Sequence, residues 1–251
     1  MSLFGHLIEE EILMTDKSNS RPVAVIAGVG AGNGQGLSQR FSDAGYAVAM
    51  LARDQAKVDV LAANIPNSKG YSCDVGDSKS VESTFSKIRA DLGDVDVLIY
   101  NAGGGVFADF ETITAEQFEA AWRVNALGSL LCAKQVSPAM IAKGSGCIIF
   151  IGATASRRGG IYTAAFAPAK AAQRSLAESM ARALWPKGIH IALAIIDGVV
   201  DIPTTRQQMP DKPNEFFVSP RALAETVYNL TIQDRQGWSF EVEVRPFREN
   251  W

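Results

Sequence analysis

Short apolar runs alternate with longer segments of helical periodicity along most of this 251-residue chain, and this alternation constrains the fold most strongly. Short apolar runs between helical segments are typical of parallel strands that are buried on both faces. The predicted strands are Val23–Ala27, Ala47–Leu51, Val95–Tyr100, Cys147–Ile151, His190–Ile196 and Phe240–Val244. The sequence therefore predicts an α/β fold, a doubly wound parallel sheet with helices on both faces.

The segments between these strands carry apolar residues at spacings of three and four, with Gly or Pro nearby, which is typical of helices. The predicted helices are Gln35–Ala44, Gln55–Asn64, Ser78–Leu92, Ala115–Ala142 and Tyr162–Trp185. Ligands of open parallel sheets bind outside the carboxyl ends of the strands. The loops that follow the strands are therefore where we expect the functional site.

The first 20 residues are polar or weakly amphipathic, and we expect a flexible N-terminal arm at 1–20 and a single domain at 21–251. The beginning of the chain carries Glu9, Glu10 and Glu11 instead of the basic segment of a secretory signal. No apolar run reaches the roughly 18 residues that a membrane span needs. We therefore expect a cytoplasmic protein that has no membrane partner.

Composition excludes several other functions. Lys and Arg number 24 against 27 Asp and Glu, and no basic run offers a surface for nucleic acid. Three cysteines without CxxC spacing and two histidines far apart in the sequence support neither a disulfide framework nor a zinc site, and no metal is predicted. The expected partner is a small molecule.

A glycine-rich segment follows the first predicted strand and leads into a helix. Its glycines are Gly28, Gly30, Gly32, Gly34 and Gly36. Such a turn lets backbone N–H groups approach a pyrophosphate at the start of a helix. The spacing Gly28-xxx-Gly32-x-Gly34 resembles the TGxxxGxG turn of the short-chain dehydrogenase/reductase family, with Ala27 in place of Thr, and this resemblance implies a Rossmann-like fold. The alternative is a tight turn that needs only positive φ angles.

Further segments resemble the family's signatures in the same order. Asp74 corresponds to the aspartate that contacts adenine, and Asn101-Ala102-Gly103 to the NNAG segment, with Tyr100 in place of its first Asn. The resemblance implies that Asn125 is the helix asparagine that organises a proton-relay water and that Lys170 is the lysine of YxxxK. Taken singly, Asp74 could be a turn residue, Asn125 a polar group that bends a helix, and Lys170 part of a solvated helix face.

The cofactor choice depends on charge at the end of the second predicted strand. An acidic residue there accepts hydrogen bonds from the ribose of NAD, whereas a basic residue accommodates the 2′-phosphate of NADP. This chain has Ala52 followed by Arg53, so we predict NADP(H) over NAD(H), because a guanidinium binds phosphate through two hydrogen bonds. The alternative is a surface ion pair between Arg53 and Asp54.

The catalytic positions depart from the family's pattern. The resemblance implies a proton-donating Tyr four residues before Lys170 and a Ser thirteen residues before that Tyr, but Phe166 and Ala153 stand there. The family's PGxxxT segment, which contacts the nicotinamide carboxamide, keeps only Gly198 and has Ile202 in place of Thr. Loss of a general acid typically lowers the rate by a factor of about 10² to 10⁴. Standard carbonyl reduction should therefore be slow unless another donor takes over.

Replacement groups lie nearby in the sequence. Tyr162 is four residues before Phe166 and shares its helix face if the helix already runs there, so it is the first candidate for the proton donor. Thr154 and Ser156 could offer a hydroxyl or could be loop and cap residues. Arg157 and Arg158 could receive an anionic substrate or could be solvated.

The predicted function is an NADP(H)-dependent oxidoreductase that moves a hydride to or from a small carbonyl, alcohol or enoyl substrate with an altered proton donor. Its predicted catalytic residues are Lys170, Asn125 and Tyr162. The alternative is a non-catalytic NADP(H)-binding sensor or regulator on the same fold. Small residues on the two long predicted helices also favour a homodimer or homotetramer, an assembly that the family commonly forms.

Overall fold

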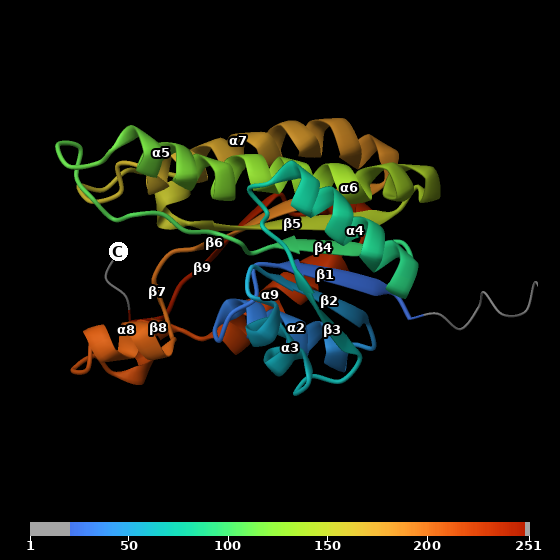
Figure 1. The fold of residues 1–251 in the computed structure, drawn as a ribbon, viewed down its shortest axis with the longest axis horizontal. Helices are drawn as coiled ribbons and strands as arrows, with labels where there is room; N and C mark the ends of the chain where they lie inside the picture. Colours follow the sequence, from blue (N-terminus) through green and yellow to red (C-terminus); the bar gives the residue numbers. More distant parts are fainter. Residues whose placement is uncertain (1–20, 249–251) are drawn as a thin grey trace, which may run out of the picture.

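A seven-stranded parallel sheet forms the centre of the protein in a computed structural model that describes residues 21–248 (Figure 1). The strand order is β3-β2-β1-β4-β5-β6-β9, so the chain runs outward from β1 to one edge and then from β4 to the other. The strands are β1 Val23–Ala27, β2 Ala47–Ala52, β3 Ser68–Ser72, β4 Val97–Tyr100, β5 Gly146–Ala153, β6 Ile189–Ile196 and β9 Glu241–Val244. The strand order reverses between β1 and β4, where such sheets bind their ligands.

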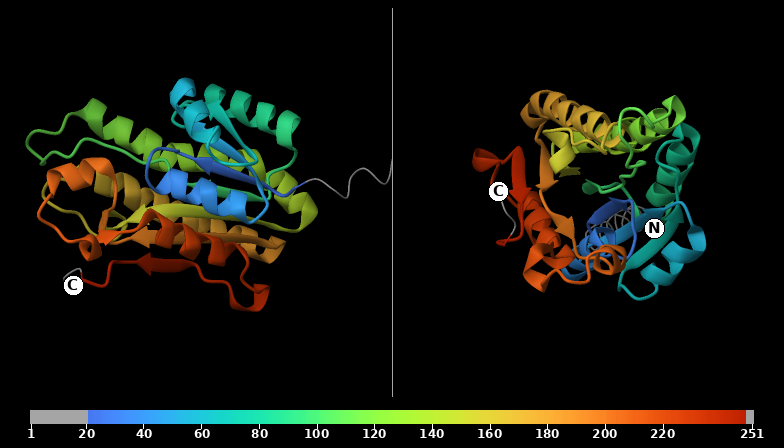
Figure 2. Two further views of the ribbon diagram at one scale, coloured as in Figure 1. Left: turned by 90° about the horizontal axis from the view of Figure 1, so that it is seen from below. Right: turned by 90° about the vertical axis from the view of Figure 1, so that its left-hand side faces the viewer.

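Helices cover both faces of the sheet, with α4 to α7 on one side and α2, α3 and α9 on the other (Figures 1 and 2). Their bounds are α2 Asn33–Asp43, α3 Gln55–Ala62, α4 Ser78–Leu92, α5 Ala115–Trp122, α6 Gly128–Lys143, α7 Phe166–Leu184 and α9 Pro220–Thr231. Successive β1 residues alternate between the two cores, since Val25 packs with the α4–α7 layer and Ile26 with the α2–α9 layer. The predicted fold class is confirmed.

One strand of the seven-stranded sheet was not predicted. β3 has the sequence SKGYS, and only Tyr71 among its five residues is buried. It lies at the edge of the sheet and pairs only with β2. The apolar-run criterion fails there because an edge strand needs few apolar side chains.

The helix predicted over Ala115–Ala142 is interrupted. The α5 helix ends at Trp122, a π-helical turn covers Arg123–Leu127, and α6 continues from Gly128. Periodicity cannot reveal this turn, because one π-helical turn shifts the pattern by a single residue. The turn contains Asn125, whose side-chain nitrogen donates to the carbonyl oxygens of Ala121 and Gly104.

The last long helix was predicted to begin at Tyr162, but α7 begins at Phe166. Pro168 supplies the physical reason: in a helix from Tyr162 it would be interior, whereas from Phe166 it lies in the first turn, where a missing N–H costs nothing. The preceding loop is held by an isolated parallel bridge between Thr163 and Ala108. Tyr162 is therefore a loop residue that is 63% exposed.

A small subassembly follows β6 at the carboxyl end of the sheet (Figure 1). It comprises the two-stranded parallel pair β7 Val199–Val200 and β8 Phe217–Val218, with α8 Pro203–Gln208 between them. No helix of residues 21–248 is long and apolar enough to cross a membrane. The predicted N-terminal arm lies outside the described residues.

Candidate active site

The glycine turn connects β1 to α2 through close backbone contacts. Gly28 has φ +93°, and a Cβ added to it would lie 2.4 Å from backbone atoms of Ala102. The side-chain nitrogen of Asn101 donates to the carbonyl oxygen of Gly28 at 2.6 Å. The glycine turn and the segment after β4 are thereby held against each other between β1 and β4, where the strand order reverses.

The beginning of α2 is suited to an anion. Its N-cap is Gly32, which offers no side-chain cap, and its first turn carries no acidic residue. A Cβ on Gly34 would lie 2.6 Å from the Cα of Val29, so only glycine lets the helix approach this loop so closely. Backbone N–H groups without a capping side chain, together with the helix dipole, favour a pyrophosphate at this position.

A cavity of about 1610 Å³ runs along the carboxyl ends of β1, β2 and β4. All but two of the predicted cofactor-binding residues line it; those that do are Gly28, Gly32, Gly34, Arg53, Asp74, Asn101, Ala102 and Gly103. The two that do not are Lys170 and Gly198. Residues that the sequence did not single out, Lys57 and Glu116 among them, also line the cavity.

Arg53 lies at the end of the cavity that β2 forms. Asp54 does not pair with it: its carboxylate caps α3 by accepting from the backbone N–H of Lys57 at 3.1 Å and lies 3.4 Å from the Lys57 ammonium. Among residues 21–248, no carboxylate forms an ion pair with the Arg53 guanidinium. Two basic side chains thus line this end of the cavity, and the arginine remains available to a ligand.

Lys170 and Asn125 come together behind Gly103. A Cβ on Gly103 would lie 3.3 Å from the Lys170 Nζ and 3.2 Å from the Asn125 Oδ1. Lys170 is only 4% exposed, and burial lowers the pKa of its amine to about 7. The amine donates to the carbonyl oxygen of Ile151 at 2.9 Å, and the Phe166 ring centre lies 5.9 Å from it.

Sequence reasoning missed Gln173, which completes this group. Its Oε1 accepts from the Lys170 amine at 3.0 Å, and its Nε2 donates to the backbone oxygen of Asn125 at 3.1 Å. The available signal was a polar residue three positions after Lys170, on the same face of a helix. The Oδ1 of Asn125, by contrast, is buried without a hydrogen-bond partner in the described part of the chain.

Two of the replacement hydroxyls named from the sequence, those of Ser156 and Thr154, have other partners. The Ser156 hydroxyl is buried and accepts from the backbone N–H of Ala153 at 3.1 Å. The Thr154 hydroxyl donates to the Asp197 carboxylate, and Tyr162 lies outside the residues that line the cavity. Tyr100 is fully buried, donates to the backbone oxygen of Val124 and has a pKa well above its usual value because of burial.

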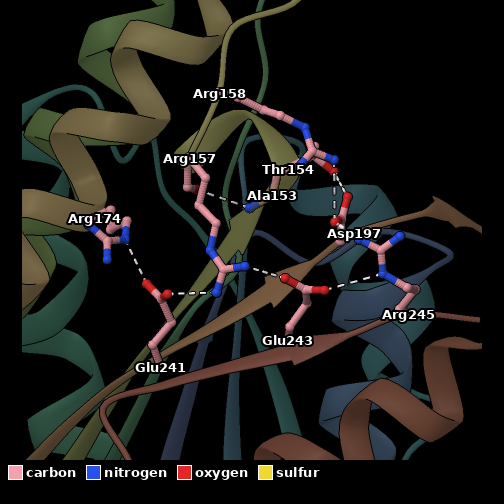
Figure 3. A network of polar contacts seen from close by, with 10 residues as sticks. Ala153, Thr154, Arg157, Arg158, Arg174, Asp197, Glu241, Glu243 and Arg245 are labelled. Carbon is pink, nitrogen blue, oxygen red and sulfur yellow. Dashed lines mark hydrogen bonds and ion pairs between the residues drawn. The ribbon is translucent and has the colours of Figure 1, made fainter. Parts of the chain in front are cut away.

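Ion pairs tie the loop after β5 to β9 (Figure 3). Arg157 pairs with Glu241 and Glu243 of β9, and Glu241 also accepts from Arg174 at 2.6 Å. Arg158 lies 3.6 Å from Asp197, which also pairs with Arg245. Both arginines that could have received an anionic substrate therefore already contact carboxylates. Their position favours a structural role for this loop.

The segment after β6 packs on the glycine turn. The Cγ2 of Ile202 lies 2.6 Å from the place where a Cβ on Gly32 would be. Ile202, Pro203 and Thr204 line the cavity, so the start of α8 forms one of its walls. Within residues 21–248, no group of three or more His, Cys, Asp or Glu side chains is placed to hold a metal ion.

The strand order, the glycine turn and the position of the cavity define a Rossmann-like protein. The profile of the short chain dehydrogenase family matches residues 22–213. The chain therefore belongs to the short-chain dehydrogenase/reductase family, whose members are oxidoreductases.

Two curated relatives illustrate the range of similarity. Galactitol 2-dehydrogenase of Agrobacterium fabrum is 34% identical over 181 residues, which cover 71% of this chain and 70% of that protein. The short-chain dehydrogenase/reductase eriH of Hericium erinaceus is 32% identical over 225 residues, which cover 86% of this chain and 88% of that protein.

Solved structures of similar proteins include nucleotide complexes. A metagenomic short-chain oxidoreductase in complex with NADP superimposes with a TM-score of 0.79 at 26% identity, covering 92% of this chain and 99% of that chain. The alcohol dehydrogenase of the archaeon Thermococcus sibiricus, complexed with 5-hydroxy-NADP, has a TM-score of 0.80 at 25% identity, with coverages of 91% and 98%.

Proposed function

We propose that the protein is an NADP(H)-dependent oxidoreductase whose proton donor differs from that of its family. One observation carries the proposal: a single cavity connects Arg53, which has no acidic partner among residues 21–248, to Gly103, behind which Lys170 lies. A guanidinium at one end suits a 2′-phosphate, and a glycine turn in the middle suits a pyrophosphate. The relatives solved with NADP support this class of cofactor.

The residues along the cavity fit a dinucleotide in order. Arg53 and Asp74 would hold its adenosine end, the Gly28–Gly34 turn its pyrophosphate, and Asn101 to Gly103 its nicotinamide half. Lys170 would bind ribose from behind Gly103, and Gly198 would lie near the carboxamide. When bound, the nicotinamide supplies or accepts a hydride; this chain binds and orients it.

Proton delivery is where this site must differ. Phe166 has no proton to give, and the Thr154 hydroxyl is engaged with Asp197. Substrates that need little acid assistance, such as a conjugated C=C bond, therefore suit the site as well as ketones do. Tyr162 is the candidate donor on the loop before α7, and Tyr162→Phe tests it: an unchanged rate with an identified substrate would exclude that role.

The cofactor proposal is tested by thermal unfolding with NADPH and, separately, NADH. A ligand at about 100 times its dissociation constant stabilises a folded protein by roughly 2.7 kcal/mol, which raises the melting temperature measurably. We expect a clear shift with NADPH, a smaller one with NADH, and loss of this difference in Arg53→Ala. Equal shifts with both nucleotides in the wild type would contradict the proposed preference.

A second candidate function is binding without turnover, as in a sensor or regulator. Phe166 and Ala153 favour it, because both family hydroxyls are missing at once. Mixing the protein with NADPH and a broad panel of aldehydes, ketones and enones separates the two functions. Tight binding without any oxidation of NADPH would favour the sensor, whereas turnover of one panel member would favour the enzyme.

A further inference from the structure

Gln173 occupies a position that links the two polar groups behind the cavity. Its side chain is fully buried on α7, one helical turn after Lys170. One end of its amide accepts from the Lys170 amine at 3.0 Å, and the other donates to the Asn125 backbone oxygen at 3.1 Å. The amide thereby connects α7 to the π-helical turn of Arg123–Leu127.

The amine of Lys170 has one bonding direction left. An amine nitrogen is tetrahedral, and two of its directions away from the side chain are taken by the Ile151 carbonyl and the Gln173 amide. The Gly103 backbone lies next to the nitrogen, at a place where a Cβ would come within 3.3 Å. Because Gly103 lines the cavity and has no side chain, it leaves the amine a path to the cofactor site.

We propose that Gln173 is a positioning residue, whose amide is anchored on Asn125 and keeps the free bonding direction of the Lys170 amine toward Gly103 and the cofactor cavity. This inference rests on the proposed function, because that function gives the cavity its occupant. An apolar residue at this position would leave the amine with the Ile151 carbonyl as its one remaining hydrogen-bond partner in the described part of the chain, and it would remove a hydrogen bond from the Asn125 backbone oxygen.

The Gln173 amide is neutral, whereas a glutamate at the same position would place a negative charge beside the Lys170 amine. No charged side chain forms an ion pair with the Lys170 amine in the described part of the chain, and burial alone shifts its pKa. Charged residues on the surrounding elements pair with one another, line the cavity or are exposed. The pairs are Arg123 with Glu119, Arg174 with Glu241, Asp197 with Arg245, Arg182 with Glu178 and Lys143 with Asp96; Glu116 lines the cavity and Lys134 is exposed.

The first test titrates Lys170 directly in the protein without cofactor. The Cε carbon of lysine, labelled with carbon-13, reports the charge of the amine by NMR, and Lys170→Met assigns the signal. In Gln173→Glu a carboxylate replaces the amide oxygen, so we expect the titration midpoint to rise by at least about one pH unit. Gln135→Glu on α6, whose side chain forms no hydrogen bond with Lys170, is the control and should leave the midpoint unchanged.

The second test measures NADPH affinity from pH 6 to pH 9. We expect Gln173→Leu to weaken binding about tenfold near neutral pH, since the amine loses its fixed direction. We expect Gln173→Glu to retain affinity but to move the pH midpoint of binding upward in parallel with the NMR midpoint. Gln135→Leu should match the wild type. If Gln173→Leu does not fold, Gln173→Glu alone carries the test.

The two readouts separate this inference from the proposed function. A Lys170 midpoint that is the same in Gln173→Glu as in the wild type would overturn the positioning role, whatever the cofactor affinity. Failure of the wild type to bind NADPH at any pH would overturn the proposed function and, with it, the orientation of the amine toward a cofactor.

Discussion

The most informative residue is Phe166, because the resemblance to the family predicts a tyrosine at this position of the sequence. The ring centre is 5.9 Å from the Lys170 amine, so an aromatic ring without a hydroxyl lies near the lysine. The sequence alone was enough to predict this substitution. It could not identify Gln173, whose importance depends on two hydrogen bonds across the fold, one of them to a residue 48 positions away.

Restoring the phenol should restore acid assistance. In Phe166→Tyr combined with Ala153→Ser, we expect the rate of ketone reduction with NADPH to rise by a factor of about 10² or more, because a positioned general acid typically contributes that much. The measurement is the initial rate of NADPH oxidation with a panel of aldehydes and ketones. Phe166→Leu is the control, and a double variant no faster than this control would show that the proton comes from elsewhere.

Lys170 should make stability depend on pH. Its pKa of about 7 in the folded protein lies below the ordinary value near 10.5 that the unfolded chain keeps. Between these values the unfolded state holds a proton that the folded state has released, so this group's contribution to stability rises with pH at up to about 1.4 kcal/mol per unit. Below pH 7 both states are protonated, and the contribution is constant.

Lys170→Met removes this dependence. We expect the free energy of unfolding of the variant, taken relative to that of the wild type, to be highest at pH 6 to 7 and to fall steadily toward pH 10. Urea unfolding at pH 6, 7, 8 and 9 measures the difference, in which other titrating groups cancel. Parallel pH profiles for the two proteins would mean that Lys170 titrates near its ordinary value.

At the scale of elements, the sequence predicted what depends on local pattern. The bounds of β1 and α4 were predicted to the residue, because each is strongly apolar or periodic and ends at Gly or a capping residue. The start of α7, the π-helical turn and the edge strand β3 were missed. Each of these depends on neighbouring elements, such as the bridge of Thr163 to Ala108, which periodicity does not record.

The glycine turn permits a matched prediction within one element. In Gly28→Ala, the positive φ and the contact with Ala102 should destabilise the protein by about 1–3 kcal/mol and weaken NADPH binding. Gly30→Ala should have neither effect, because a Cβ added to Gly30 meets no atom of the described residues within 4 Å. Melting temperatures and NADPH titrations of both variants check this, and equal losses would contradict the structural distinction.

At the scale of the whole molecule, the strands and the position of the cavity could be predicted from the sequence, whereas contacts between distant segments could not. Six of the seven strands and the position of the ligand cavity follow from apolar runs and from the rule that ligands bind at strand carboxyl ends. The ion pairs that join the loop after β5 to β9 could not be predicted, because the partners are 84 and 86 residues apart in the sequence.

The oligomeric state is a prediction at this same scale. Phe118 and Trp122 are each 42% exposed on α5, next to the long helices α6 and α7. We propose that this helical layer joins copies of the chain into a homodimer or homotetramer. Light scattering at micromolar concentration should give two or four times the 26.9 kDa of one chain, and Trp122→Glu should lower that mass. A wild-type mass of one chain would exclude the assembly.

The π-helical turn also sets how α6 is rotated about the helix axis relative to α5. Each residue of an α-helix advances about 100° around the axis, so one residue more or fewer turns everything beyond it by that angle. On one side of the turn, Ala121 packs with Ala165 and Ala169 of α7; on the other, Cys132 and Met140 pack in the core. A single-residue deletion between 122 and 128 would leave a regular helix that cannot bury both sets at once, so the length of this short segment is fixed by the packing on its two sides.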